Sequence, residues 1–211
     1  VLMRRYRRLQ DLICFGLVPI FAGFAFGTGP VFSYVFGEAS AVGLLLPACL
    51  LALGFYMNGT VTIPYFFSLA MERPDIATRQ NFYALFITLP LAGLLTWKFG
   101  LVGAAASWVS YHLFYYIYCV PRLCRECLAV SLPGWYLHVA RAFAAACASY
   151  LVAWVAVVHH APLAIPTVLS SYLGATVVYS LISWFSIGTE LKGSILEKLH
   201  RQKPTGGADA T

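Results

Sequence analysis

Long apolar runs separated by short charged stretches make up almost all of this 211-residue chain. Most of these runs approach or exceed the roughly 20 residues that a helix needs to cross a bilayer. We predict six such spans, over residues 9–27, 39–71, 82–97, 101–120, 135–158 and 163–187. The first is expected to end at Thr28-Gly29-Pro30 because these residues break helices. The pattern therefore predicts an all-α, polytopic membrane bundle.

The run over residues 39–71 decides the number of spans. As one helix of 33 residues it would be about 50 Å long, against a hydrocarbon core of about 30 Å. Two spans meeting at Asn58-Gly59 would leave only 12 residues for the second, which is too few to cross. We therefore expect one long helix, tilted or bent at Pro64. Pro64 and Pro90 are candidate hinges, because a proline inside a helix leaves a carbonyl without its partner and permits bending.

Composition and charge support a membrane location. Apolar residues make up 60% of the chain and charged residues 10%, whereas soluble domains average about 25% charged. The net charge of +6 is divided among small groups between the runs, with no stripe that would suit a nucleic acid. Six spans place 13 of the 14 lysines and arginines on one side and leave only Lys98 on the other. Both termini are therefore expected in the cytoplasm.

The charged stretch SLAMERPDIATRQN, residues 68–81, lies between the second and third predicted spans. It could bind a ligand, or it could be a cytoplasmic turn that fixes the topology. The residue before a proline disfavours the helical conformation, so Arg73-Pro74 predicts a helix end, and Asp75 is placed to cap the helix that follows. The turn is the simpler interpretation.

Few residues suggest catalysis. All eight acids lie at predicted span ends or in loops, so no carboxylate is expected deep in the bundle, where proton relays keep one. A membrane acyltransferase would need a histidine–carboxylate pair within a span, and the sequence predicts none. Cys119, Cys124 and Cys127 have the spacing of one iron–sulfur class, although buried free thiols are commoner. We expect no catalytic residue, metal or cofactor.

His112 is the polar residue that stands out within a span. It lies in the fourth span, in the stretch SWVSYH. A polar side chain at that depth faces other protein or a cavity. His112 is therefore interpreted either as lining a cavity or as a hydrogen-bonded packing residue.

Several motifs occur in an order that resembles a known family. An arginine-rich start precedes an apolar helix and the stretch VFSYVFGEAS; a long helix with a central proline, NGTVTIPYFFSLAMERPDIATRQN, follows, and then WKFGLVGAAASW. This order resembles the C-terminal half of polysaccharide flippases of the Wzx type, in the multidrug/oligosaccharidyl-lipid/polysaccharide exporter superfamily. The resemblance covers about residues 4–127. Residues 128–187 look like two additional helices, and residues 188–211 like a cytoplasmic tail whose end has a disordered composition.

The resemblance implies a substrate and a mechanism. Such proteins move an undecaprenyl-pyrophosphate-linked oligosaccharide across the bacterial inner membrane by alternating access, between two helix bundles around a central cavity. Cationic groups in that cavity would pair with phosphates, and amides and hydroxyls with sugars. The candidate cavity residues in this chain are Arg79, Asn81, Asn58, Tyr65, Ser68 and His112.

The chain holds only the second bundle of such a transporter. We expect a fragment whose N-terminal bundle belongs to the same gene, with a separate N-terminal chain as the alternative. The competing hypotheses are a non-transporting scaffold of a polysaccharide assembly complex and a membrane enzyme.

Overall fold

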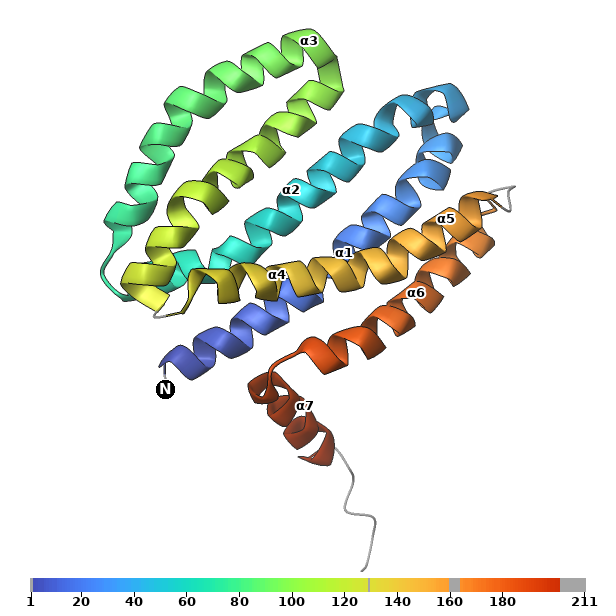
Figure 1. The fold of residues 1–211 in the computed structure, drawn as a ribbon. Coiled ribbons are helices and arrows are strands. Elements are labelled where there is room, and N and C mark those ends of the chain that lie inside the picture. Colours follow the sequence, from blue (N-terminus) through green and yellow to red (C-terminus); the bar gives the residue numbers. More distant parts are fainter. Residues whose placement is uncertain (1, 129, 160–163, 202–211) are drawn as a thin grey trace, which may run out of the picture.

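The computed structural model describes residues 2–128, 130–159 and 164–201, and all its regular elements are helices (Figure 1). The α-helices are α1 (Leu2–Phe36), α2 (Glu38–Ala70), α3 (Pro74–Leu123), α4 (Leu132–Ala146), α5 (Val152–His159), α6 (Ile165–Ser186) and α7 (Thr189–Arg201). Two π-helical segments, η1 (Cys124–Leu128) and η2 (Cys147–Leu151), follow α3 and α4. The C-terminal stretch 204–211, for which the sequence predicts disorder, lies outside the described residues.

Among the described residues, five helical segments are long and apolar enough to cross a membrane, and one of them is folded in two. Gly100 interrupts α3 with φ 57° and ψ −131°, a backbone conformation that essentially only glycine adopts. The chain reverses there, so the two legs of α3 run side by side as a hairpin (Figure 1). Large apolar side chains such as Leu89, Leu101 and Phe185 are more than half exposed on the outside of the bundle, which suits contact with lipid. The prediction of an all-α polytopic bundle is confirmed.

The predicted break at Thr28-Gly29-Pro30 is wrong. Helix α1 continues through these residues to Phe36, and the hydroxyl of Thr28 donates to the carbonyl of Phe24, 2.7 Å away. In membrane helices such side-chain bonds and neighbouring helices make proline tolerable. The chain breaks instead at Gly37, whose φ of 82° ends α1 before α2 begins. The prediction of a single helix over the second run is confirmed by α2.

Helix α1 packs against α2, α4, α6 and α7. Its Pro19 explains how α6 attaches to it. Pro19 has no N–H, so the carbonyl of Phe15 loses its helical partner. The Tyr179 hydroxyl of α6 donates to that carbonyl at 2.9 Å. The Tyr172 hydroxyl donates to the carbonyl of Pro19 itself at 2.9 Å. Helix α6 therefore supplies a hydrogen bond to the one carbonyl that Pro19 leaves without a helical partner.

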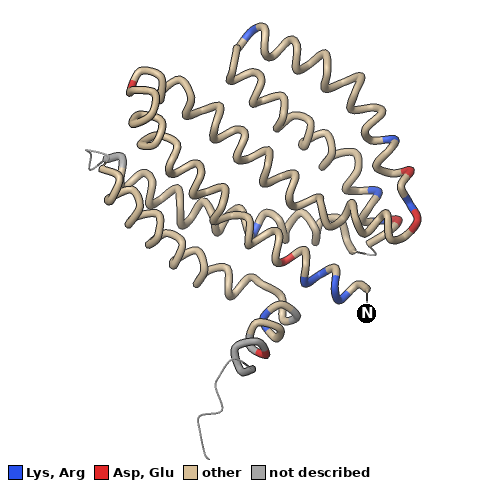
Figure 2. The backbone as a smooth tube through the Cα atoms, turned by 180° about the vertical axis from the view of Figure 1, so that it is seen from behind, with Lys and Arg blue, Asp and Glu red and all other residues tan. Residues whose placement is uncertain are grey.

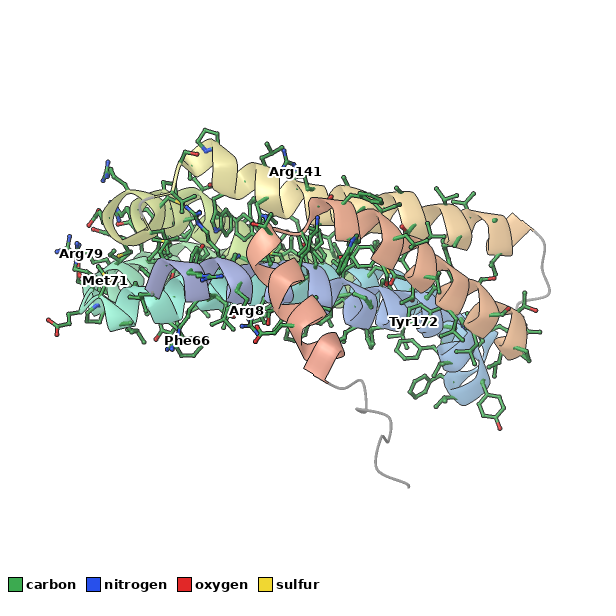
Figure 3. All side chains as sticks on the ribbon, turned by 90° about the horizontal axis from the view of Figure 1, so that it is seen from below. Arg8, Phe66, Met71, Arg79, Arg141 and Tyr172 are labelled. Atoms are coloured by element: carbon green, nitrogen blue, oxygen red, sulfur yellow. The ribbon has the colours of Figure 1, made fainter. Side chains whose placement is uncertain are left out.

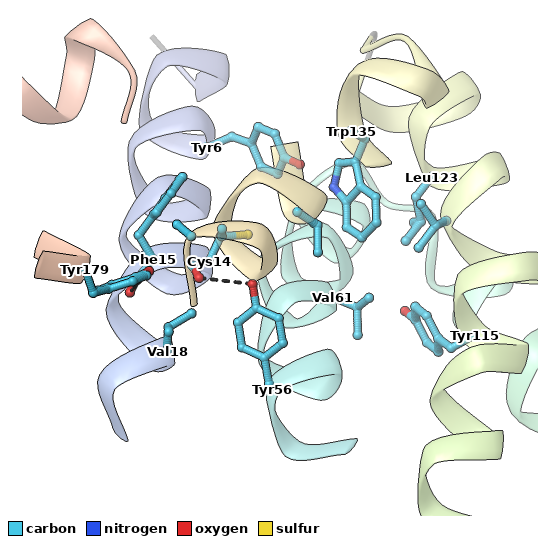
Figure 4. Close-up of a cluster of buried hydrophobic side chains, with 14 of the residues drawn as sticks. Tyr6, Cys14, Phe15, Val18, Tyr56, Val61, Tyr115, Leu123, Trp135 and Tyr179 are labelled. Atoms are coloured by element: carbon cyan, nitrogen blue, oxygen red, sulfur yellow. Dashed lines mark hydrogen bonds between the residues drawn. The ribbon is translucent and has the colours of Figure 1, made fainter. Parts of the chain in front are cut away.

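The same arrangement occurs at Pro64 in α2. The carbonyl of Thr60, four residues earlier, accepts a hydrogen bond from the side-chain amide of Gln10 at 2.8 Å. The Tyr56 hydroxyl of α2 donates to the carbonyl of Cys14 in α1 at 3.2 Å, in the middle of the buried cluster (Figure 4). Pro64 is thus buried in an unbroken helix tied to α1, while Pro90 is exposed on the first leg of α3.

The turn between α2 and α3 is held by ion pairs. Arg73 contacts Asp75 at 2.8 Å and Glu126 of η1 at 2.5 Å. These hydrogen bonds, that to Asp75 first, raise the pKa of Arg73 above its ordinary value, so the guanidinium stays charged. The predicted cap by Asp75 is wrong: α3 begins at Pro74 with Arg73 at the N-cap and no side-chain cap bond, because Arg73 holds the carboxylate.

Most charged residues gather at one end of the bundle (Figure 2). The Arg73–Glu126 contact joins the α2–α3 turn to η1, and the backbone N–H of Gly188 donates to Asp11, which joins the α6–α7 connection to α1. Lys98 lies beside the Gly100 bend at the other end. We call the first of these ends the basic end.

Candidate functional site

A polar cavity of about 190 Å³ lies between α2 and the two legs of α3. We call it the Asn81 pocket. Its lining residues are Asn58, Val61, Thr62, Tyr65, Ala77, Asn81, Tyr111, His112 and Tyr115. The structure therefore brings four of the six predicted cavity residues to one place: Asn58, Tyr65, Asn81 and His112.

Helical spacing and the α3 hairpin position these side chains. Asn58, Thr62 and Tyr65 are four and three residues apart on α2, so they share one face. Asn81 comes from the first leg of α3, and the Gly100 bend returns Tyr111 beside it on the second leg. The Tyr111 hydroxyl donates to Oδ1 of Asn81 at 3.0 Å. This bond leaves the amide N–H₂ of Asn81 available to a ligand.

His112 is nearly fully buried at the wall of this pocket, with 2% of its surface exposed. The ring of Trp108 packs edge-on against it, with centroids 4.5 Å apart, and the ring of Tyr111 lies at 5.0 Å. Neither ring nitrogen has a hydrogen-bond partner within the part of the chain that the structure describes. His112 thus combines a packed ring with polar atoms that can still accept or donate.

Two predicted cavity residues do not line the pocket. Ser68 is fully buried, and its hydroxyl donates to the carbonyl of Tyr65 at 2.7 Å. Arg79 is exposed at the basic end of the bundle, the end at which Figure 3 also labels Met71. The pocket lining consequently includes no arginine or lysine. Its amides, hydroxyls and aromatic rings suit neutral hydroxyl-bearing groups better than phosphates.

Gln80 is a notable buried residue that sequence reasoning named only as part of a motif. It has no exposed surface, and neither atom of its side-chain amide has a partner among the described residues. A buried amide without partners costs about 1 to 3 kcal/mol. Its place next to Asn81 could have suggested a role, but the sequence does not reveal the burial.

We predict that Gln80→Met stabilises the chain. The substitution removes the unpaired amide while keeping a flexible side chain of similar length, and should raise the free energy of unfolding by about 1 kcal/mol. Denaturant unfolding in detergent micelles would measure it, with Thr78→Val, an exposed change on the same leg, as control. A Gln80→Met chain less stable than the original would show that the amide has a partner.

A second polar site lies at the basic end and was not predicted. Asp11 of α1 is buried, with Oδ1 at 3.3 Å from Nε2 of His138 on α4, and Oδ2 accepts the Gly188 N–H at 3.1 Å. The expectation that no histidine pairs with a carboxylate within a span is wrong. The sequence separates these residues by more than 120 positions, and only the packing of α4 on α1 brings them together.

The possible metal ligands among the described residues are not arranged as a metal site. Cys119, Cys124 and Cys127 are buried free thiols. Within the described residues, no group of three or more His, Cys, Asp or Glu side chains is placed to hold a metal ion.

Comparisons with protein families, with characterised proteins and with solved structures gave no match.

Proposed function

We propose that this chain is the C-terminal half of a flippase that moves lipid-linked oligosaccharides across the bacterial inner membrane, with its basic end in the cytoplasm. The observation that carries the proposal is the polar face around the Asn81 pocket. Asn58, Tyr65 and Asn81 are exposed in this chain. Asn58 lies 12 residues before the end of α2, which places it about 18 Å along the helix from that end.

Polar side chains at such depth do not face lipid, because lipid offers them no hydrogen bonds. They require either water or another protein surface. A second helix bundle facing α2 and α3 would enclose this polar face as the wall of a central cavity. The resemblance to the C-terminal half of Wzx-type flippases implies such a bundle, encoded in the same gene or as a separate chain.

The lining of the pocket indicates which part of the substrate it would meet. Amide and hydroxyl groups from Asn58, Asn81 and Tyr111 can exchange hydrogen bonds with sugar hydroxyls. With no arginine or lysine in the lining, the undecaprenyl pyrophosphate would be held elsewhere. Arg79, exposed and outside the pocket, remains a candidate for contact with the phosphates at the cytoplasmic mouth.

We predict that Asn58→Ala and Asn81→Ala each lower polysaccharide export. Loss of one hydrogen bond worth about 1 kcal/mol corresponds to a roughly fivefold reduction. The assay uses a flippase-deficient strain expressing the chain joined to an N-terminal bundle, and Thr78→Ala is the matched control, since its hydroxyl bonds to the carbonyl of Pro74 and lies outside the pocket.

Three outcomes would count against the proposal. Failure of every full-length reconstruction to restore export would contradict the flippase function. Normal export in both asparagine variants would contradict the role of the pocket. Stable co-purification with a polymerase and no export activity would favour the scaffold.

The Asp11–His138 pair makes a membrane acyltransferase the second candidate function. Acyl transfer by the purified chain that is abolished in His138→Gln would favour this candidate.

A further inference from the structure

A cavity of about 370 Å³ at the basic end has the features of a ligand site, and it is separate from the Asn81 pocket. It lies between α1, the start of α4 and the α6–α7 connection. We call it the Asp11 pocket. Its lining residues are Tyr6, Arg7, Gln10, Asp11, Val130, Gly134, Trp135, His138, Gly188 and Thr189.

Three deeply buried side chains that line this pocket carry polar atoms with unused hydrogen-bonding capacity. Tyr6, Gln10 and Trp135 are each at most 4% exposed. Within the described parts of the chain, Oε1 of Gln10 has no hydrogen-bond partner, and the Tyr6 hydroxyl and Nε1 of Trp135 have none but each other. Buried polar atoms are normally paired. Their gathering on one cavity wall indicates that a ligand completes their hydrogen bonds.

The charged groups of the lining indicate the ligand's chemistry. Arg7 is cationic and exposed at the mouth, whereas Asp11 is anionic and buried. A ligand carrying only negative charge would be attracted to Arg7 and repelled by Asp11. A simple cation would be attracted to Asp11 and repelled by Arg7. A zwitterion with a phosphate and an amine, joined by a short linker, satisfies both.

The place of the pocket indicates where such a group comes from. Arg4, Arg5 and Arg8 lie on the same end of α1, the level of the bundle at which lipid headgroups are expected. Exposed Gly134 and Thr189 lie at the rim, so the pocket opens beside the first residues of α4 and α7. A phospholipid of the adjacent leaflet can therefore reach it with its headgroup.

We propose that the Asp11 pocket binds the headgroup of a phospholipid that carries a primary amine. The amine donates to Asp11 and to Oε1 of Gln10, while the phosphate accepts from Arg7, from the Tyr6 hydroxyl and from Nε1 of Trp135. Because Gly188 N–H also bonds Asp11, the bound lipid would stabilise the α6–α7 connection.

The test compares three lipids added to the full chain in detergent: phosphatidylethanolamine, phosphatidylcholine and phosphatidylglycerol. Phosphatidylcholine keeps the charges of the first lipid but has no amine N–H to donate. A bound lipid stabilises the folded state, so we expect phosphatidylethanolamine to raise the melting temperature more than the other two do. Native mass spectrometry should show one retained molecule of it.

Variants assign the effect to the pocket. Arg7→Gln and Asp11→Asn should each abolish the excess shift given by phosphatidylethanolamine, and Arg8→Gln, outside the lining, should retain it. Arg7 is exposed, so its variant tests the proposal even where Asp11→Asn folds poorly. Equal shifts from all three lipids, or a larger phosphatidylglycerol shift that survives in Asp11→Asn, would overturn the proposal. Neither result bears on export through the Asn81 pocket.

Discussion

Gly103→Val should prevent the α3 hairpin from forming. A Cβ atom at position 103 would overlap the carbonyl group of Leu95 on the preceding leg. The obstacle is backbone rather than a flexible side chain, so no rotamer change relieves it. We expect a loss of more than about 3 kcal/mol in stability, at the upper end of overpacking effects. The measurement is the yield of monodisperse protein after extraction, followed by its unfolding in denaturant.

Gly93→Ala is the matched control for this prediction. Gly93 lies on the first leg of the same hairpin, and a Cβ there would meet nothing within 4 Å. Alanine favours a helix over glycine by about 1 kcal/mol, so this variant should be as stable as the original or more so. A Gly103→Val chain that purifies and unfolds like Gly93→Ala would contradict the close contact between the two legs.

The hairpin illustrates what the sequence predicts well. Apolar runs on both sides of Lys98 and Gly100 predicted two spans with a turn between them, and the structure places the turn at Gly100. Such runs are informative because a bilayer demands a fixed length of apolar helix. The same rule correctly kept α2 as one helix. Helix ends within an apolar run were less predictable, as the continuation of α1 through Pro30 demonstrates.

Prolines show why local sequence is insufficient to predict where a helix ends or bends within an apolar run. A proline predicts a carbonyl that loses its helical partner, but whether the helix bends depends on what replaces that bond. At Pro64 the replacement is Gln10, more than 50 positions away. In the sequence, a glutamine near four arginines suggests an exposed helix end, so its bond to Thr60 is not predictable from local sequence.

The two pockets differ in how far their residues can be predicted from the sequence. Asn58, Tyr65, Asn81 and His112 could be selected from the sequence because polar residues within apolar runs attract attention. Arg79 was selected for its charge, and the structure leaves it outside the pocket. The position of Asp11 near the start of the first predicted span suggests a span-end acid, whereas the structure buries it against His138. Its partner lies on a helix distant in sequence, so no spacing rule could identify the pair.

The Asp11–His138 pair should give the largest non-additive effect in the chain. Asp11→Leu leaves His138 without its carboxylate and the Gly188 N–H without its acceptor. His138→Leu leaves a buried carboxylate without its partner. Removing one partner from a buried polar contact leaves the other without its interaction, which costs about 1 to 3 kcal/mol. We therefore expect about 2 kcal/mol for either single variant.

The double variant Asp11→Leu/His138→Leu tests whether the two side chains interact or contribute to stability independently. Replacing both members with apolar side chains leaves neither polar group without its partner, so the double variant should be less destabilised than the sum of the single variants by about 1 kcal/mol or more. Denaturant unfolding of all four chains measures this coupling. Additive losses would mean that the 3.3 Å approach of Asp11 to His138 contributes nothing to stability, and that the Gly188 contact alone accounts for the effect of Asp11→Leu.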